Sequence, residues 1–170
     1  MATATKIPLA SVTLSAATAS ITFSGISQSY TDLLLVAMWR KSGNGSQDKI
    51  DCRVNGDSGT NYSDTYLYGG GSSAASGRET GKTMFMAGYA ASSDASSGAF
   101  GMTTMNFQSY SNTTTYKTII NNSFTSAPSG VVIPCVGLWR STAAITSITL
   151  YPDDNSNWIS GCTFNLYGIL

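Results

Sequence analysis

The chain has 170 residues, of which 42% are apolar and only 11% are charged, and its formal net charge is zero. Ordinary soluble domains are about 25% charged, so Ser, Thr, Asn and Gly must supply most of this surface. Without a basic stripe to meet phosphates, we expect no nucleic acid partner. The apolar content excludes a disordered chain, and the length predicts one domain over residues 1–170.

Short segments in which apolar and polar residues alternate, the pattern of a half-buried strand, recur along the chain between turns rich in Gly, Ser and Asn. In chain order the predicted strands are Ile7–Leu14, Ser20–Ile26, Thr31–Lys41, Lys49–Asn55, Thr83–Ala90, Gly98–Gln108, Thr114–Asn121, Val131–Arg140, Ala144–Tyr151 and Ile159–Leu170. Changes of parity near Ser11 and between Met102 and Met105 predict bulges. Pro134 predicts an edge or a bulge in its strand.

Two predicted strands, Thr31–Lys41 and Val131–Arg140, are apolar on both faces. Successive side chains of a strand point to opposite faces, so one set enters the core and the other needs a separate cover. In the first strand the outward set is Leu34, Val36 and Met38. Residues 38–41 (MWRK) and 138–141 (LWRS) also echo one another, which would fit two related halves.

Gly56–Lys82 shows no sustained period and is predicted to be a long loop, docked on another subunit or on a larger assembly. Its tyrosines, beside Asp57 and Asp64, suggest two roles. Rings and polar groups together form a sugar-binding surface, whereas Tyr is also favoured in packing and at protein interfaces. We favour packing. The tyrosines concerned are Tyr62, Tyr66 and Tyr68.

The absence of alternating strands and helices disfavours a parallel sheet. Many short strands with Gly-rich turns predict an all-β fold, an antiparallel two-sheet β-sandwich that is jelly-roll-like. The residues expected in its core are Leu33, Leu35, Ile50, Val54, Phe164 and Leu166.

Motifs that would carry chemistry fail on inspection, so we expect no enzyme and no cofactor. SGRETGKT, beginning at Ser76, lacks the first glycine of a phosphate-binding loop and precedes a strand-like segment. Asp153–Asn157 has oxygens spaced for calcium but no glycine or bidentate Glu at the required places, so a polar turn is favoured over an ion site. A serine nucleophile would have no histidine to activate it, because the chain contains none.

The three cysteines, Cys52, Cys135 and Cys162, lie far apart in alternating apolar segments. We expect three small core residues, with one disulfide as the alternative. Together with the lack of histidine, this argues against a zinc site. No run is long and apolar enough for a signal peptide or a membrane span. We therefore expect a protein made in a cytoplasm, with no membrane partner.

Five segments of the sequence match the strands and one loop of a known group of proteins. They are ITFSGI (residues 21–26) leading into TDLLLVAMWR (31–40), NGDSGTNYSDTYLYGGG (55–71), AITSITLY (144–151) and ISGCTFNLYGI (159–169). In this order they resemble the opening strand pair, the loop after the fourth strand and the two closing strands of small β-sandwich virion proteins of tailed bacteriophages.

The resemblance implies a non-enzymatic structural protein of the virion, assembled in the host cytoplasm. Its first implied role is capsid decoration, or cement, on the major capsid protein. The second is a tail or head-fibre appendage that binds a host receptor glycan. No shaft-like segment is evident in the sequence, and this favours decoration.

We also expect self-association, because a sandwich has only one interior and monomers rarely leave large apolar patches in water. Capsid geometry suggests three copies. A loop or the N-terminal segment is the alternative cover for the patch. The residues expected to contact a partner are Leu34, Val36, Met38, Tyr62, Tyr66 and Tyr68.

Overall fold

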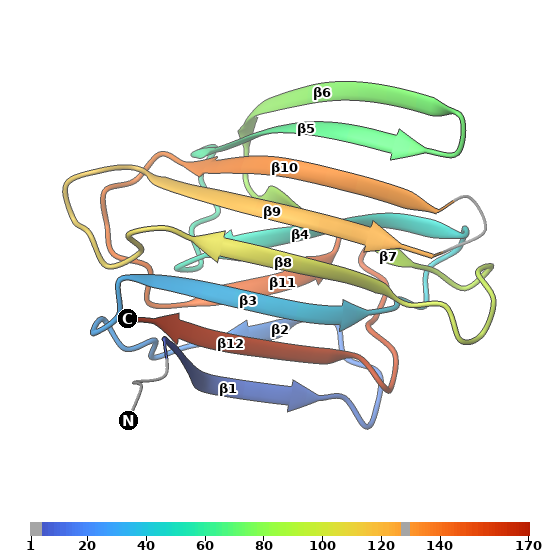
Figure 1. The fold of residues 1–170 in the computed structure, drawn as a ribbon, viewed down its shortest axis with the longest axis horizontal. Coiled ribbons are helices and arrows are strands. Elements are labelled where there is room, and N and C mark those ends of the chain that lie inside the picture. The colour runs from blue at the N-terminus through green and yellow to red at the C-terminus, as the bar shows by residue number, and fades with distance from the viewer. Residues whose placement is uncertain (1–4, 127–129) are drawn as a thin grey trace.

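The chain folds as a sandwich of two β-sheets (Figure 1). The structure, a computed structural model, describes residues 5–126 and 130–170. Every regular element in these residues is a strand. The strands are β1 (Lys6–Thr13), β2 (Ile21–Phe23), β3 (Asp32–Trp39), β4 (Gln47–Val54), β5 (Tyr62–Gly70), β6 (Ser73–Lys82), β7 (Phe85–Ala91), β8 (Gly101–Phe107), β9 (Lys117–Thr125), β10 (Val131–Trp139), β11 (Ile148–Pro152) and β12 (Thr163–Ile169).

The two sheets differ in width. The larger sheet has eight strands in the order β1-β12-β3-β8-β9-β10-β5-β6, and the smaller has four in the order β2-β11-β4-β7. All of these strand pairs are antiparallel, which confirms the predicted two-sheet sandwich. On one side β5 and β6 extend beyond the smaller sheet (Figure 1).

The space between the sheets is filled by the inward side chains of both. Each predicted core residue is at most 1% exposed: Leu33, Leu35, Ile50, Val54, Phe164 and Leu166. Trp39 and Trp158 stack at one end with ring centroids 5.5 Å apart. The three cysteines are buried and free, so their predicted place as small core residues is confirmed.

The predicted long loop at 56–82 is wrong. Most of it is the β5–β6 hairpin, closed by a turn in which Gly71 has a positive φ of 57°. The hairpin is ordered by its own chain, because β5 pairs with β10. Alternation was present at even positions from Tyr62 to Tyr68, but the glycine triplet and the Ser/Ala run of β6 obscured it.

Three predicted irregularities can be compared with the strands. The shift in β1 lies between Pro8 and Ala10, close to the predicted position. The predicted bulge in β8 is wrong, since β8 pairs in continuous register with both neighbours. The prediction for Pro134 is wrong in both forms, because β10 is an interior strand and neither of its pairings has a register shift, although the β10–β5 ladder skips Ile133 and Pro134.

The free edge of β7 is turned toward the inner surface of the larger sheet, where side chains take the place of a neighbouring strand. At Met86 the backbone N–H donates to Asp64 Oδ2 at 3.1 Å, and the carbonyl accepts from Asn121 Nδ2 at 2.7 Å. Thr103 Oγ1 donates to the Ala87 carbonyl at 3.0 Å.

The same arrangement continues at Tyr89. Its backbone N–H donates to Ser123 Oγ at 3.0 Å, and its carbonyl accepts from Trp39 Nε1 at 3.0 Å. Gly88, with a φ of 142°, lets the backbone approach Ser123, because a Cβ there would lie 2.4 Å from that hydroxyl. Polar residues on an inward face are therefore structural here, since they satisfy backbone groups that would otherwise be buried without partners.

We predict that Asn121→Leu lowers the free energy of unfolding by about 2 kcal/mol, because the buried Met86 carbonyl loses its donor while side-chain volume is kept. Urea unfolding measures the change. Asn122→Leu, on the exposed face of the same strand, is the control and should stay within about 0.5 kcal/mol of wild type. Equal stability of the two variants would contradict the role of Asn121.

Candidate interaction surface

The surface of the larger sheet that points away from the core is apolar over its central strands. Strand register arranges its residues in three rows across β3, β8, β9 and β10. We call these rows, with the adjoining Leu67 of β5, the outer sheet face. The rows are Met38–Met102–Phe124–Val132, Val36–Thr104–Asn122–Pro134 and Leu34–Asn106–Ile120–Val136.

The outer sheet face carries no charged side chain in these rows, and its apolar side chains are well exposed. Leu67 is 59% exposed, Val132 and Val136 are each 47% exposed, and Met38 is 43% exposed. Burying a large apolar side chain completely stabilises by about 1.5–3 kcal/mol. Several half-exposed apolar side chains on one sheet face therefore offer a substantial driving force for association.

The outward residues predicted from the first both-face-apolar strand lie on this surface. Met38 is exposed, whereas Leu34 and Val36 are half-buried between their neighbours on β12 and β8. The rest of the surface was not singled out from the sequence. The signal existed in β10, whose segment is apolar on both faces, but Ile120 and Phe124 of β9 alternate with polar residues and resemble core positions.

A shallow hollow of about 250 Å³ lies between β10 and β5. Its lining includes Pro134, Leu67 and Ile120. Proline has no backbone N–H to donate, and the β10–β5 ladder skips Ile133 and Pro134, although the register is the same on both sides of them. The hollow thus lies on the outer sheet face where these two pairs are missing from the ladder.

The three predicted contact tyrosines do not form one surface. Tyr62 is fully buried, so the prediction that it contacts a partner is wrong. Its hydroxyl lies 3.1 Å from the Val54 carbonyl oxygen and 3.0 Å from that of Asp57, and burial raises its pKa. The sequence could not show this, because an aromatic residue beside Gly and Asp looks the same whether it packs inward or outward.

Tyr66 and Tyr68 lie on the inner side of β5, where the hairpin extends past the smaller sheet. Both are partly buried and pack with Tyr89 of β7 against the cluster of Met86, Val131, Ile133 and Cys135. The Tyr68 and Tyr89 rings meet edge to face with centroids 6.3 Å apart. They hold the hairpin to its own domain, as the packing interpretation predicted.

Charged groups reinforce the same junction. Lys49 Nζ lies 3.2 Å from Asp51 Oδ1 and 3.6 Å from Glu79 Oε2, and so joins β4 to β6. Burial raises the pKa of both Asp51 and Asp64, although Lys49 opposes the rise in each. A bond from Lys82 lowers the pKa of Glu79. These side chains serve the fold and are engaged in ion pairs or backbone hydrogen bonds.

The acidic turn that resembled a calcium loop surrounds a lysine. Carboxylate oxygens of Asp48, Asp153 and Asp154 lie within 4.8 Å of one another. The fully buried Lys41 ammonium is 2.6 Å from Asp48 Oδ2, 2.7 Å from Asp154 Oδ2 and 3.9 Å from Asp153 Oδ1. The positive charge at this turn is therefore supplied by the chain itself.

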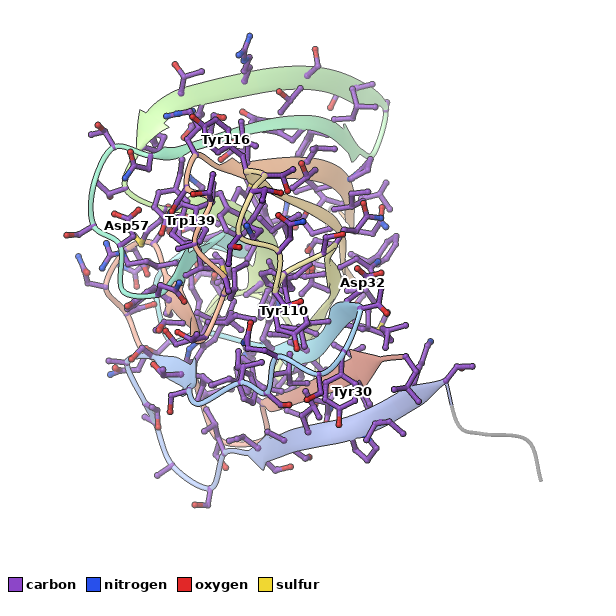
Figure 2. All side chains as sticks on the ribbon, turned by 90° about the vertical axis from the view of Figure 1, so that its left-hand side faces the viewer. Tyr30, Asp32, Asp57, Tyr110, Tyr116 and Trp139 are labelled. Atoms are coloured by element: carbon purple, nitrogen blue, oxygen red, sulfur yellow. The ribbon has the colours of Figure 1, made fainter. Side chains whose placement is uncertain are left out.

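At the end of the sandwich shown in Figure 2, Asp57 fixes a loop against β10. Its Oδ2 accepts from Trp139 Nε1 at 2.7 Å and from Asn61 Nδ2 at 2.9 Å. These two bonds, with a further one from the Gly59 N–H, lower the pKa of Asp57. Although Asp57 was weighed as part of a sugar site, its carboxylate is committed to structure.

Comparison of the chain with protein families, with curated proteins and with solved structures gives no match. Within residues 5–126 and 130–170, no helix is long and apolar enough to cross a membrane. Function must therefore be argued from the surface itself.

The carboxylates around Lys41 predict opposite changes in stability when Asp153 and its neighbour Asp154 are each replaced by Asn. Burial, followed by repulsion from Asp48 and Asp51, raises the pKa of Asp153 to about 6. The folded state thus holds a proton that the unfolded chain has released, and stability falls as pH rises from about 4 to 6. Asp153→Asn should therefore raise the free energy of unfolding by about 1 kcal/mol at pH 7, allowing for solvent screening. Near pH 3.5 it should leave the free energy of unfolding unchanged.

Asp154 should behave in the opposite way. Burial raises its pKa, but hydrogen bonds from Lys41 and Ser156 outweigh this and lower it to about 2. Its stabilisation is present above the unfolded pKa near 4 and is lost as pH falls toward 2. Asp154→Asn should cost about 1 kcal/mol at pH 7. Chemical unfolding at several pH values measures the stability of both variants. If both were more stable, or both less stable, than wild type at pH 7, the opposite pKa shifts of the two residues would be contradicted.

Proposed function

We propose that this chain is a structural protein of a bacteriophage virion, a capsid decoration protein that associates through its outer sheet face. It acts by covering surface and not by catalysis. The observation that carries the proposal is the mostly apolar outer sheet face, which has no charged residue in its three rows although it spans four central strands. Such a face is suited to permanent burial against protein.

Strand order supports the kind of module. In the part of the sandwich formed by β1-β12-β3-β8 facing β2-β11-β4-β7, the chain passes between the sheets from β1 to β2, from β2 to β3, from β3 to β4, from β7 to β8 and from β11 to β12. We interpret this interleaved order as a jelly roll, with β5, β6, β9 and β10 as added strands. Jelly rolls are common in viral capsids and in lectins.

The composition is suited to a protein whose copies are packed close together on a surface. The 11% charged fraction leaves little repulsion between copies held close together. Three copies around a threefold capsid site would bury their outer sheet faces against each other and against the major capsid protein. Because this face has no charged residue in its three rows, burying it against another protein leaves no ion of this chain without a partner.

We predict that the purified chain sediments as a trimer and that Val36→Asp and Val136→Asp each dissociate it without unfolding the sandwich. The introduced carboxylate would be buried without a partner in the assembled form. Sedimentation and far-ultraviolet circular dichroism measure the two properties. Thr13→Asp, on an exposed position of β1, is the control. A monomeric wild type, or trimers unaffected by both changes, would contradict association through this face.

Electron microscopy of intact particles that contain this chain tests the proposed location. Density for the sandwich on the head would support decoration, with the outer sheet face against protein. Density on a tail or fibre would support the alternative.

The alternative is an appendage domain that binds a receptor glycan. One observation favours it: Tyr66, Tyr68 and Tyr89 are partly exposed beside Lys49 on the flank of the hairpin. Aromatic faces near charged groups are a common basis for sugar stacking. Glycan-array binding that is lost in Tyr68→Ala and kept in Val36→Asp would favour this role.

A further inference from the structure

The sandwich has four strand edges, and three of them are protected against pairing with another chain. β1 carries Pro8 and a register shift beside it. β2 is only 3 residues long. The edge of β7 is occupied by side chains from the larger sheet. Proline, a bulge, shortness and cover are the usual devices against edge-to-edge association.

The fourth edge, β6, is long, free of proline and uncovered, and its one register shift lies near its end, where Thr80 and Lys82 pair with Ser63 and Tyr62. It is 10 residues long, contains no proline, and pairs on one side only, with β5. Eight of its residues are exposed and the other two, Gly77 and Glu79, are intermediate. Its register with β5 is continuous from Ser73 to Thr80. Among the described residues it therefore presents a long, regular row of backbone groups to solvent.

We infer that β6 is an assembly edge, where the β6 strands of two copies of this chain pair antiparallel about a twofold axis at Gly77. A second copy is proposed as the partner of β6 because of how charge is distributed along the strand. Arg78, Glu79 and Lys82 lie in its second half, and the first half, from Ser73 to Ser76, is small and uncharged. Antiparallel pairing about Gly77 sets Arg78 and Glu79 opposite small residues of the strand, and Lys82 opposite Ser72 of the hairpin turn.

The register can be written residue by residue. Ser76 faces Arg78 of the second copy, Ala75 faces Glu79, and Ala74 faces Thr80. Shifting the twofold axis to Arg78 or to Glu79 would place like charges directly opposite, which is destabilising. Shifting it to Ser76 avoids that clash, but leaves Thr80 opposite Ser72 in the hairpin turn. The Gly77 register pairs the longest stretch of regular strand.

The charged residues of β6 do not themselves block this edge. Strand side chains project to the two faces and not along the hydrogen-bonding direction. Arg78 lies opposite Thr65 on the outer side, and Glu79 is directed to the inner side, where it pairs with Lys82 at 2.9 Å. Pairing of two copies would also join their outer sheet faces into one continuous surface.

This inference is independent of the proposed function, and its test separates the two. The full chain carrying Val36→Asp, which removes the proposed face association, is examined by sedimentation at concentrations up to about 1 mM. We expect a reversible dimer. In this background Ser76→Glu should lower the Kd about tenfold, because the introduced carboxylate faces Arg78 of the other copy at two places in each dimer. Ser76→Arg should raise the Kd about tenfold, because like charges then face one another.

Combining Ser76→Arg with Arg78→Glu should bring the Kd back to that of the parent or below it, since opposite charges again face one another. Thr13→Arg, on the β1 edge, is the control and should leave the Kd unchanged. A monomer throughout the concentration range would overturn the inference. So would a dimer in which Ser76→Glu and Ser76→Arg have the same effect, because that result excludes the register.

A covalent measurement checks the geometry independently. Ala74→Cys together with Thr80→Cys should form two disulfides between copies under mild oxidation, because directly opposed antiparallel residues lie within disulfide reach. Ala74→Cys with Ser76→Cys is the matched control and should remain largely uncrosslinked. Equal crosslinking of the two pairs would overturn the proposed pairing. The native cysteines are buried and do not compete.

Discussion

The constraint on which the sandwich depends is the unpaired backbone of β7. A four-stranded sheet facing an eight-stranded one leaves an edge strand beneath the wider sheet, where water does not reach its N–H and C=O groups. Asp64, Asn121, Thr103 and Ser123 satisfy these groups from three different strands of the larger sheet. These bonds, from β5, β8 and β9, fix the position of the smaller sheet beneath the larger one. Packing alone would allow it to slide, because apolar contacts have no direction.

In strands with regular alternation the buried face was predictable, whereas in a strand whose inner face is polar it was not. β3 and β4 follow the period of two, and their core residues are those expected. β9 buries Lys117, Asn121 and Ser123, whereas its exposed Ile120 and Phe124 have the spacing expected of core residues. The reason is physical: a polar side chain bonded to a backbone edge 30 or more residues away leaves no local signal.

Only part of the outer sheet face was predictable from the sequence. β3 revealed its outward apolar set because both of its faces are apolar, whereas the contributions of β8, β9 and β5 emerge only once register aligns them. The echoed Trp-Arg pairs also acquire a role. Arg40 donates to carbonyls of the 93–99 loop, and Arg140 donates to the carbonyls of Thr60 and Tyr62. Each pair thus anchors a loop at its end of the sandwich.

The interruption beside Pro134 has a consequence for the motions of the chain. The β5–β6 hairpin is joined to the remainder of the larger sheet along one strand boundary, and the ladder at that boundary skips Ile133 and Pro134. Local opening follows the weakest contiguous set of contacts. The hairpin is therefore the first unit to open, while β3, β8 and β9 stay closed until the whole domain unfolds. In hydrogen exchange its amides would lose protection together, as one cooperative segment.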